Sequence, residues 1–129
     1  MAQNLNQAVA DAGIEVPGMV CAAAVLVPDG IILGGTGAEL LTELEPLVRS
    51  AARCFPTAGD PDLADRDPAV EFAFVGDEEI IVIQGGRSEP RLAFAVICTR
   101  ETNLAFVLAA SRKAIATLEQ VVDMRPWVR

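Results

Sequence analysis

An acidic segment in the middle of the chain is the strongest candidate for a metal site. It holds four aspartates, namely Asp60, Asp62, Asp65 and Asp67. With Asp60 as the first ligand of an EF-hand loop, Asp62 takes the third position and Glu71 the twelfth. The fifth position is then Ala64, and the sixth, which must be glycine, is Asp65. The sequence therefore favours a solvated acidic loop and predicts no bound metal.

A glycine-rich stretch, Gly34–Gly37, follows an apolar run and precedes a helical pattern, which is where phosphate-binding loops lie. A dinucleotide fingerprint counted from Gly35 would need glycine where Leu40 stands. A Walker A motif would need a lysine, and no lysine is near. We interpret the stretch as a flexible link into the helix and predict no nucleotide cofactor.

The usual catalytic side chains are largely missing. The chain has no histidine, which excludes Ser-His-Asp and Cys-His arrangements and His-ligated zinc. Each of the three cysteines lies in an apolar run, which predicts small buried side chains in a reducing compartment: Cys21, Cys54 and Cys98. Cys54 would need a base to act as a nucleophile, and its neighbour Arg53 is not one. The sequence predicts that the protein is not an enzyme.

Paired carboxylates do not change that prediction. Glu78 and Glu79 lie in an expected turn, and Glu43 and Glu45 are two residues apart on an expected helix, so they do not share a helix face. Solvated positions are the simplest interpretation of both pairs.

Composition limits the class of partner. The chain of 129 residues fits one domain, residues 1–129, with a short tail over about 124–129. The net charge of −8 argues against nucleic acid, whose binders need a basic surface.

No basic residue precedes Arg49, which predicts no secretory signal, and the apolar run Val16–Pro28 is too short to cross a bilayer. We expect a cytoplasmic protein without membrane insertion; its abundant arginine and alanine favour a bacterial source.

The sequence of the first half of the chain predicts a helix, a hairpin and a second helix. Helical spacing from Leu5 to Ala12 ends at Gly13. The run Met19–Val27 and the partner Ile31–Leu33 flank a turn in which Gly30 takes the left-handed position. The second helix carries an apolar stripe of Leu40, Leu41, Leu44, Leu47, Val48, Ala51 and Phe55. Either it begins late, at Glu43, or it bends at Pro46.

The sequence of the second half predicts a hairpin, one further strand and a long helix. Val70–Val75 and Ile80–Gln84 flank a two-residue turn, Gly76-Asp77, expected to be type II′. Leu92–Cys98 is a continuous apolar run, and Thr102 or Asn103 can cap the last helix. Its apolar stripe comprises Leu104, Val107, Leu108, Ser111, Ile115, Leu118 and Val122.

These elements predict an α/β protein, a three-layer sandwich in the order α-β-β-α-β-β-β-α. Short links between strands require antiparallel pairing, so a five-stranded antiparallel sheet carries helices on both faces. Met19–Val27 and Leu92–Cys98 lack polar alternation, which places them in the centre. Val70–Val75 alternates and contains Glu71, which makes it an edge candidate.

In this order the chain resembles the Roadblock/dynein light-chain family, over about Leu5 to Gln120. The residues that carry the resemblance are Val16–Val20, Pro28–Leu33 and Thr102–Val107. The resemblance implies a non-catalytic, dimerising scaffold for signalling. Bacterial members of the mutual gliding protein B type bind a small Ras-like GTPase and can stimulate its hydrolysis. No catalytic residue is carried over by the resemblance.

A homodimer would use the edge strand and the second helix, since both offer apolar surface that a monomer would have to hide. The expected interface residues are Leu40, Leu41, Leu44, Leu47, Val48, Ala51, Val70, Phe72 and Phe74. Arg49 and Arg53, four apart on one helix face, are candidates for contact with the GTPase.

Two other functions stay open at this point. A small-molecule sensor domain would have a buried polar cavity between helix and sheet, and the sequence shows no cluster of buried polar residues. A small enzyme would have a perturbed acid or a reactive Cys54 in a cleft.

Overall fold

The computed structural model describes residues 5–27, 30–37, 44–46, 48–50, 71–89 and 91–123. The helices and strands are α1 (Leu5–Gly13), β1 (Met19–Leu26), β2 (Ile31–Thr36), β3 (Glu71–Val75), β4 (Glu79–Gly85), β5 (Leu92–Thr99) and α3 (Leu104–Val121). Residues 44–46 and 48–50 are also helical and fall between β2 and β3 along the chain. The order of elements agrees with the sequence prediction. None of the described helices is long and apolar enough to cross a membrane.

The strands form one antiparallel sheet in the order β2-β1-β5-β4-β3. β1 and β5 lie in the centre, and every residue of β5 from Leu92 to Cys98 is buried. β3 is an edge strand, as the alternation of its side chains predicted. Both central strands are continuously apolar because neither face of the sheet meets water there.

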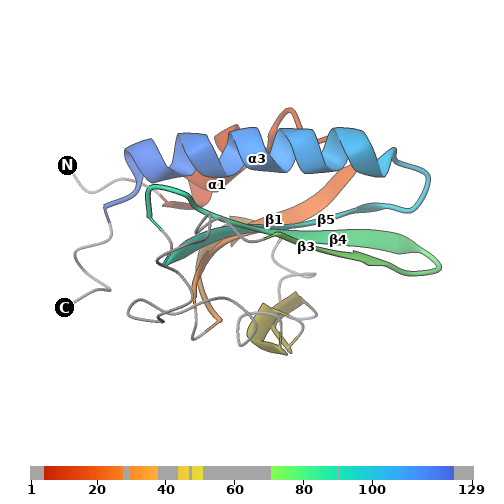
Figure 1. Cartoon of the computed structure of the whole chain (residues 1–129), viewed down its shortest axis with the longest axis horizontal. Helices are drawn as coiled ribbons and strands as arrows, with labels where there is room; N and C mark the ends of the chain where they lie inside the picture. Colours follow the sequence, from red (N-terminus) through yellow and green to blue (C-terminus); the bar gives the residue numbers. More distant parts are fainter. Residues whose placement is uncertain are drawn as a thin grey trace, which may run out of the picture.

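Helices cover both faces of this sheet (Figure 1). α1 and α3 lie on one face, where they pack with Phe94, Val96 and Cys98 of β5. The helical residues 44–46 and 48–50 lie on the opposite face, where Leu44 and Val48 pack with the second set of inward-pointing side chains. Alternate residues of each central strand thus feed two separate cores, and the predicted three-layer sandwich is confirmed.

The β1–β2 turn depends on a glycine. Gly30 has a φ of 74° and donates its N–H to the Leu26 carbonyl at 2.8 Å, as the left-handed turn position predicted. A Cβ at this position would lie 2.7 Å from the Cα of Arg49. Gly30 therefore also lets the helical segment around residue 49 approach the turn closely.

β2 is longer than predicted. Gly34, Gly35 and Thr36 continue the strand, with Gly35 opposite Ala23, where the sequence predicted a link into the next helix. The physical reason is close packing: a Cβ on Gly34 would come within 2.9 Å of the Leu5 Cγ in α1. Glycine in a strand often marks such an approach of another element.

The predicted turn between β3 and β4 was wrong by one residue. Gly76 still pairs with the opposite strand, donating its N–H to the Glu79 carbonyl at 2.8 Å, which leaves Asp77 and Glu78 as the two turn residues. None of these residues has a positive φ, so the turn is not type II′. The strand still ends at Val75, and the hydrogen bond of Gly76 to Glu79 moves the two turn residues one position along the chain.

Several sequence predictions fall outside the described residues. They concern the start of the second helix, the aspartate loop and the tail. Pro46 itself lies among the helical residues 44–46.

The cap of α3 gives a first testable prediction. The Asn103 Oδ1 accepts hydrogen bonds from the N–H groups of Ala105, at 2.9 Å, and Phe106, at 3.4 Å. Replacing Asn103→Ala leaves these groups without a side-chain partner and should lower the free energy of unfolding by about 1 kcal/mol. Urea denaturation measures the change, and Asn103→Ser, which restores an acceptor, should recover most of it. Equal losses in both variants would contradict the capping role.

Candidate functional site

The edge strand β3 exposes apolar side chains. Phe74 is 37% exposed and Val75 is 51% exposed, although both belong to a strand of a largely apolar sheet. The rings of Phe72 and Phe74 stack, with centroids 6.5 Å apart, and Phe72 packs against the core beneath residues 44–48. The β3 edge is therefore an apolar surface that extends outward from the core containing Leu44 and Val48.

The two edges of the sheet differ. On β2, the Asn6 Oδ1 of α1 accepts the Gly35 N–H at 2.9 Å, so α1 satisfies a backbone group that would otherwise face outward. On β3, β4 is the single strand partner within the described part of the chain, and no further strand of that part pairs with its outer side. Among the described strands, β3 is therefore the edge at which a further strand can be added.

The helical residues 44–46 and 48–50 present a polar outer side. Leu44 and Val48 are each 1% exposed and lie in the core between this helix and the sheet. They pack this helix against its own sheet. Arg49 points outward with its side chain 62% exposed, and its Nη2 lies 2.8 Å from the Glu45 Oε1.

The structure thus places five of the predicted site residues: Leu44, Val48, Arg49, Phe72 and Phe74. The others lie outside the described residues: Leu40, Leu41, Leu47, Ala51, Arg53 and Val70. The aromatic pair and the helix lie on the same face of the sheet, since Phe72 packs with the core that contains Leu44 and Val48. Whether these residues form an interface stays a prediction.

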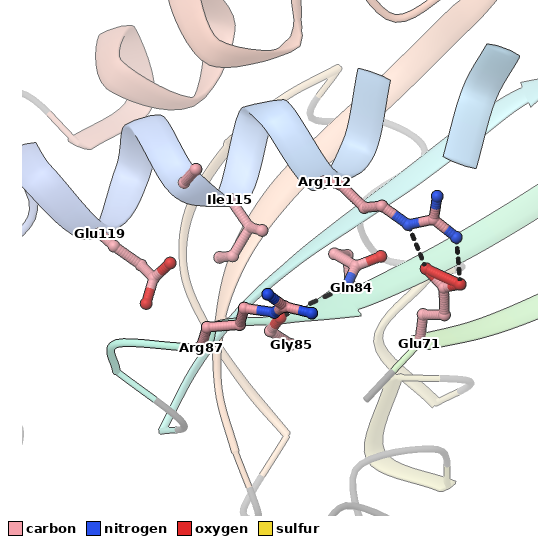
Figure 2. Close-up of a pocket in the computed structure, with 8 residues that line it drawn as sticks. Glu71, Gln84, Gly85, Arg87, Arg112, Ile115 and Glu119 are labelled. Carbon is pink, nitrogen blue, oxygen red and sulfur yellow. Dashed lines mark hydrogen bonds and ion pairs between the residues drawn. The ribbon is translucent and has the colours of Figure 1, made fainter. Parts of the chain in front are cut away.

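A second feature was not predicted. A pocket of about 590 Å³ lies between α3 and the ends of β3 and β4 (Figure 2). Its wall combines Gln84 of β4, Arg112, Ile115 and Glu119 of α3, and Arg87 from the loop after β4. It is a polar cavity between helix and sheet, a feature for which the sequence gives no local signal.

One rim of this pocket is an ion pair between β3 and α3. The Arg112 Nε and Nη2 donate to the two carboxylate oxygens of Glu71 at 3.0 Å and 2.7 Å (Figure 2). These hydrogen bonds raise the pKa of the Arg112 guanidinium above its usual range. The pair is solvent-exposed and contributes little to stability, but its two-point geometry fixes the position of Arg112.

The floor of the pocket contains an unsatisfied amide. Gln84 is 5% exposed, its Nε2 faces the Gly85 carbonyl at 3.4 Å, and its Oε1 is buried without a hydrogen-bond partner. The Oγ of Ser111 on α3 is the other such atom among the described residues. The signal for Gln84 in the sequence is one polar residue after an apolar run, a pattern that is equally typical of the end of a strand.

Solved structures of known proteins share the fold of this chain, although no family model matches the sequence and no curated protein matches it. A Roadblock/LC7 domain from Streptomyces avermitilis aligns with a TM-score of 0.66 and 12% identity, over 92% of this chain and 97% of that one. MglB of Myxococcus xanthus aligns with a TM-score of 0.67 and 16% identity, over 91% of this chain and 93% of that one. This chain has the Roadblock/LC7 fold.

Gliding protein MglB from Thermus thermophilus has the Roadblock/LC7 fold at a TM-score of 0.59, with 14% identity over 94% of this chain and 96% of that one. At such identities the similarity is one of fold. It confirms the fold to which the three short motifs pointed.

In this Roadblock/LC7 sheet, Cys21 and Cys98 are buried free thiols, as predicted from their apolar surroundings. Burial, followed by the charge of Cys21, raises the pKa of the Cys98 thiol to about 11. Within the described residues, no group of three or more acidic, cysteine or histidine side chains is placed to hold a metal ion.

We expect both thiols to resist modification in the native protein. At pH 8 the Cys98 thiol stays protonated because its pKa is raised, and the thiolate is the reactive form. In a Cys54→Ser background, Ellman's reagent should label Cys21 and Cys98 only after denaturation. Above pH 9 the unfolded thiol ionises first, so Cys98 should lower stability as the pH approaches 11. Rapid labelling of the native protein would contradict this.

Proposed function

We propose that this chain is a non-catalytic homodimeric scaffold that binds a small Ras-like GTPase and modulates its nucleotide cycle. The observation that carries the proposal is the β3 edge with Phe74 and Val75 exposed, in a sheet whose other edge, β2, donates the Gly35 N–H to Asn6 of α1. The Roadblock/LC7 fold and the short motifs support the choice of partner class.

A self-complementary contact explains why the assembly would stop at two. If β3 pairs with β3 of a second copy, each chain uses the same edge, and the contact is the same from both sides. An assembly with two open edges per chain would instead continue into a fibre. The stacked pair of Phe72 and Phe74 would extend the apolar contact on the face that the helix over residues 44–50 occupies.

The dimer can be tested with two exposed apolar residues of similar accessibility. Phe74→Asp places a charge on the β3 edge and, through the symmetry, next to its counterpart, so we expect dissociation. Val121 of α3 is 41% exposed against 37% for Phe74, and Val121→Asp should leave the dimer intact. Multi-angle light scattering at tens of micromolar reports the mass. A monomeric wild-type protein, or equal dissociation in both variants, would refute the dimer.

A role in GTP chemistry has to act through the partner's own site. The chain lacks histidine, and none of its motifs matches a phosphate-binding loop. A scaffold can still change hydrolysis by selecting one conformation of the GTPase, to the extent that it binds the two states with different affinity. Its charge of −8 favours a partner with a basic patch and faster association at low salt.

The buried free Cys21 and Cys98 support a reducing, cytoplasmic location.

The partner is tested by mixing the purified protein with each small GTPase of its organism, loaded with GDP or a GTP analogue. Binding to one GTPase in one nucleotide state is the expected result, measured by calorimetry. The absence of binding to any of them in either state would refute this function and leave only the fold.

Arg49 separates two ways of acting on hydrolysis. Its ion pair with Glu45 at 2.8 Å along the helix supports a surface position, so Arg49→Ala should change affinity and hydrolysis rate only slightly. An arginine inserted into the GTPase site would be worth roughly 10³–10⁵ in rate. Single-turnover hydrolysis with wild type and Arg49→Ala distinguishes these outcomes; Arg100→Ala, which removes an exposed arginine near the β3–β4 hairpin, is the control. A thousandfold loss confined to Arg49→Ala would establish an arginine finger.

A further inference from the structure

The helical layer made by α1 and α3 carries the two most exposed large apolar side chains among the described residues (Figure 1). Ile14, directly after α1, is 78% exposed, and Phe106, in the first turn of α3, is 66% exposed. Ile14 and Ala110 line the same hollow, and Phe106 lies one helical turn before Ala110 on the same side of α3. These residues form one surface, the α1–α3 patch. Apolar exposure that is grouped in this way is typical of an interaction site.

The hollow in this patch has a volume of about 210 Å³ and lies between α1 and α3. Half of its eight lining residues are apolar, namely Ala12, Ile14, Ala110 and Ala114. An apolar cavity of about 150 Å³ is enough to hold a benzene molecule, so this hollow has room for one phenyl ring. Phe106 of the same chain is not among the lining residues. The patch therefore contains a projecting aromatic ring and, beside it, a hollow that this ring does not fill.

The charges of the patch permit the approach of an equally acidic chain. The polar half of the lining consists of Asp11, Glu15, Lys113 and Thr117. The Lys113 Nζ lies 3.3 Å from the Glu15 Oε2, and the Asp11 Oδ1 accepts a hydrogen bond from the Gln7 Nε2 at 2.8 Å. Two chains with a net charge of −8 repel each other in general, but here a lysine compensates one of the two carboxylates. The ammonium group of Lys113 can also lie over the face of an incoming phenyl ring.

We propose that the α1–α3 patch binds a second copy of this chain about a two-fold axis near Ala110, with the Phe106 ring of each copy in the hollow of the other. Phe106 lies one turn before Ala110, and Lys113 and Ala114 of the hollow lie one turn after it. A two-fold rotation at Ala110 exchanges these positions, so the two α3 helices cross antiparallel and the contact is the same from both sides. Small side chains at the crossing, Ala109 and Ala110, allow the helices to approach closely.

This contact is separate from the β3 edge. The patch lies on the face of the sheet opposite Leu44 and Val48, and it includes no residue of β3. It therefore stands whether or not the chain pairs through β3 or binds a GTPase. The patch is small, so we expect a weak contact that forms at hundreds of micromolar, well above the concentration that tests the β3 dimer.

The test is sedimentation velocity of the full chain from roughly 10 μM to roughly 1 mM, the range of weak association. The mass should double over this range, whatever its value at the low end. Phe106→Asp should weaken this step about tenfold or more. An aspartate in the first turn of a helix is favourable, so the fold should persist, which thermal melting checks. Val121→Asp, at an exposed apolar residue at the other end of α3, is the control and should associate normally.

A mass that stays constant up to 1 mM would overturn the proposal and leave the patch for a different protein. Equal association by Phe106→Asp and Val121→Asp would overturn it as well. A monomer at the low end that doubles at the high end would instead contradict the β3 dimer and support the α1–α3 contact.

A cysteine cross-link tests the position of the two-fold axis. In a Cys54→Ser background, Cys21 and Cys98 are buried, and Ala110→Cys adds a thiol at the proposed axis. A disulfide needs Cα atoms within about 7 Å, so Ala110→Cys should form linked dimers on mild oxidation at high concentration. Thr117→Cys, which is also exposed and lines the hollow, lies away from the axis and should cross-link at least about tenfold more slowly. Equal rates for the two variants, or no cross-link at position 110, would overturn the proposed geometry.

Discussion

The antiparallel pairing of β1 with β5 is the interaction on which the rest of the structure depends. Seven residue pairs, from Met19 opposite Cys98 to Leu26 opposite Leu92, join the two central strands. Both strands are apolar on both faces, so the pair is stable in water only when a layer of helix covers each side. α1 and α3 supply one layer, and the helical residues 44–46 and 48–50 contribute to the other. The three-layer architecture follows from this one constraint.

The β1–β5 pairing also determines which strands form the edges of the sheet. With β1 and β5 in the centre, β2 and β3 become the edges, and α1 lies close enough to β2 for Asn6 to accept the Gly35 N–H. Gly34 makes that approach possible because any side chain there would collide with Leu5. A glycine stretch that resembled a phosphate-binding loop thus has a packing role. This packing affects function only indirectly: because α1 bonds to the β2 edge, β3 is the edge favoured for association with another chain.

The polar pocket and the β3 edge lie close together without sharing their chemistry. Glu71 belongs to β3, is opposite Gln84 in the sheet and holds Arg112 of α3 at the rim. Side chains on one face of β3 therefore reach the pocket, while Phe72 and Phe74 on the other face belong to the apolar surface. The alternation of a strand allows one short element to serve two surfaces.

The sequence by itself determined the elements, their order and the central strands, because these depend on local periodicity and on how apolar each run is. It also determined the Gly30 turn, which needs a particular residue type, and limited the cap of α3 to Thr102 or Asn103, of which the structure uses Asn103. Only the tertiary structure decided that Gly34–Thr36 form a strand, that Leu44 and Val48 face their own core, and that Gln84 and Arg112 meet around one pocket. These features depend on contacts between segments far apart along the chain. Local patterns carry no information about which distant side chain will lie opposite.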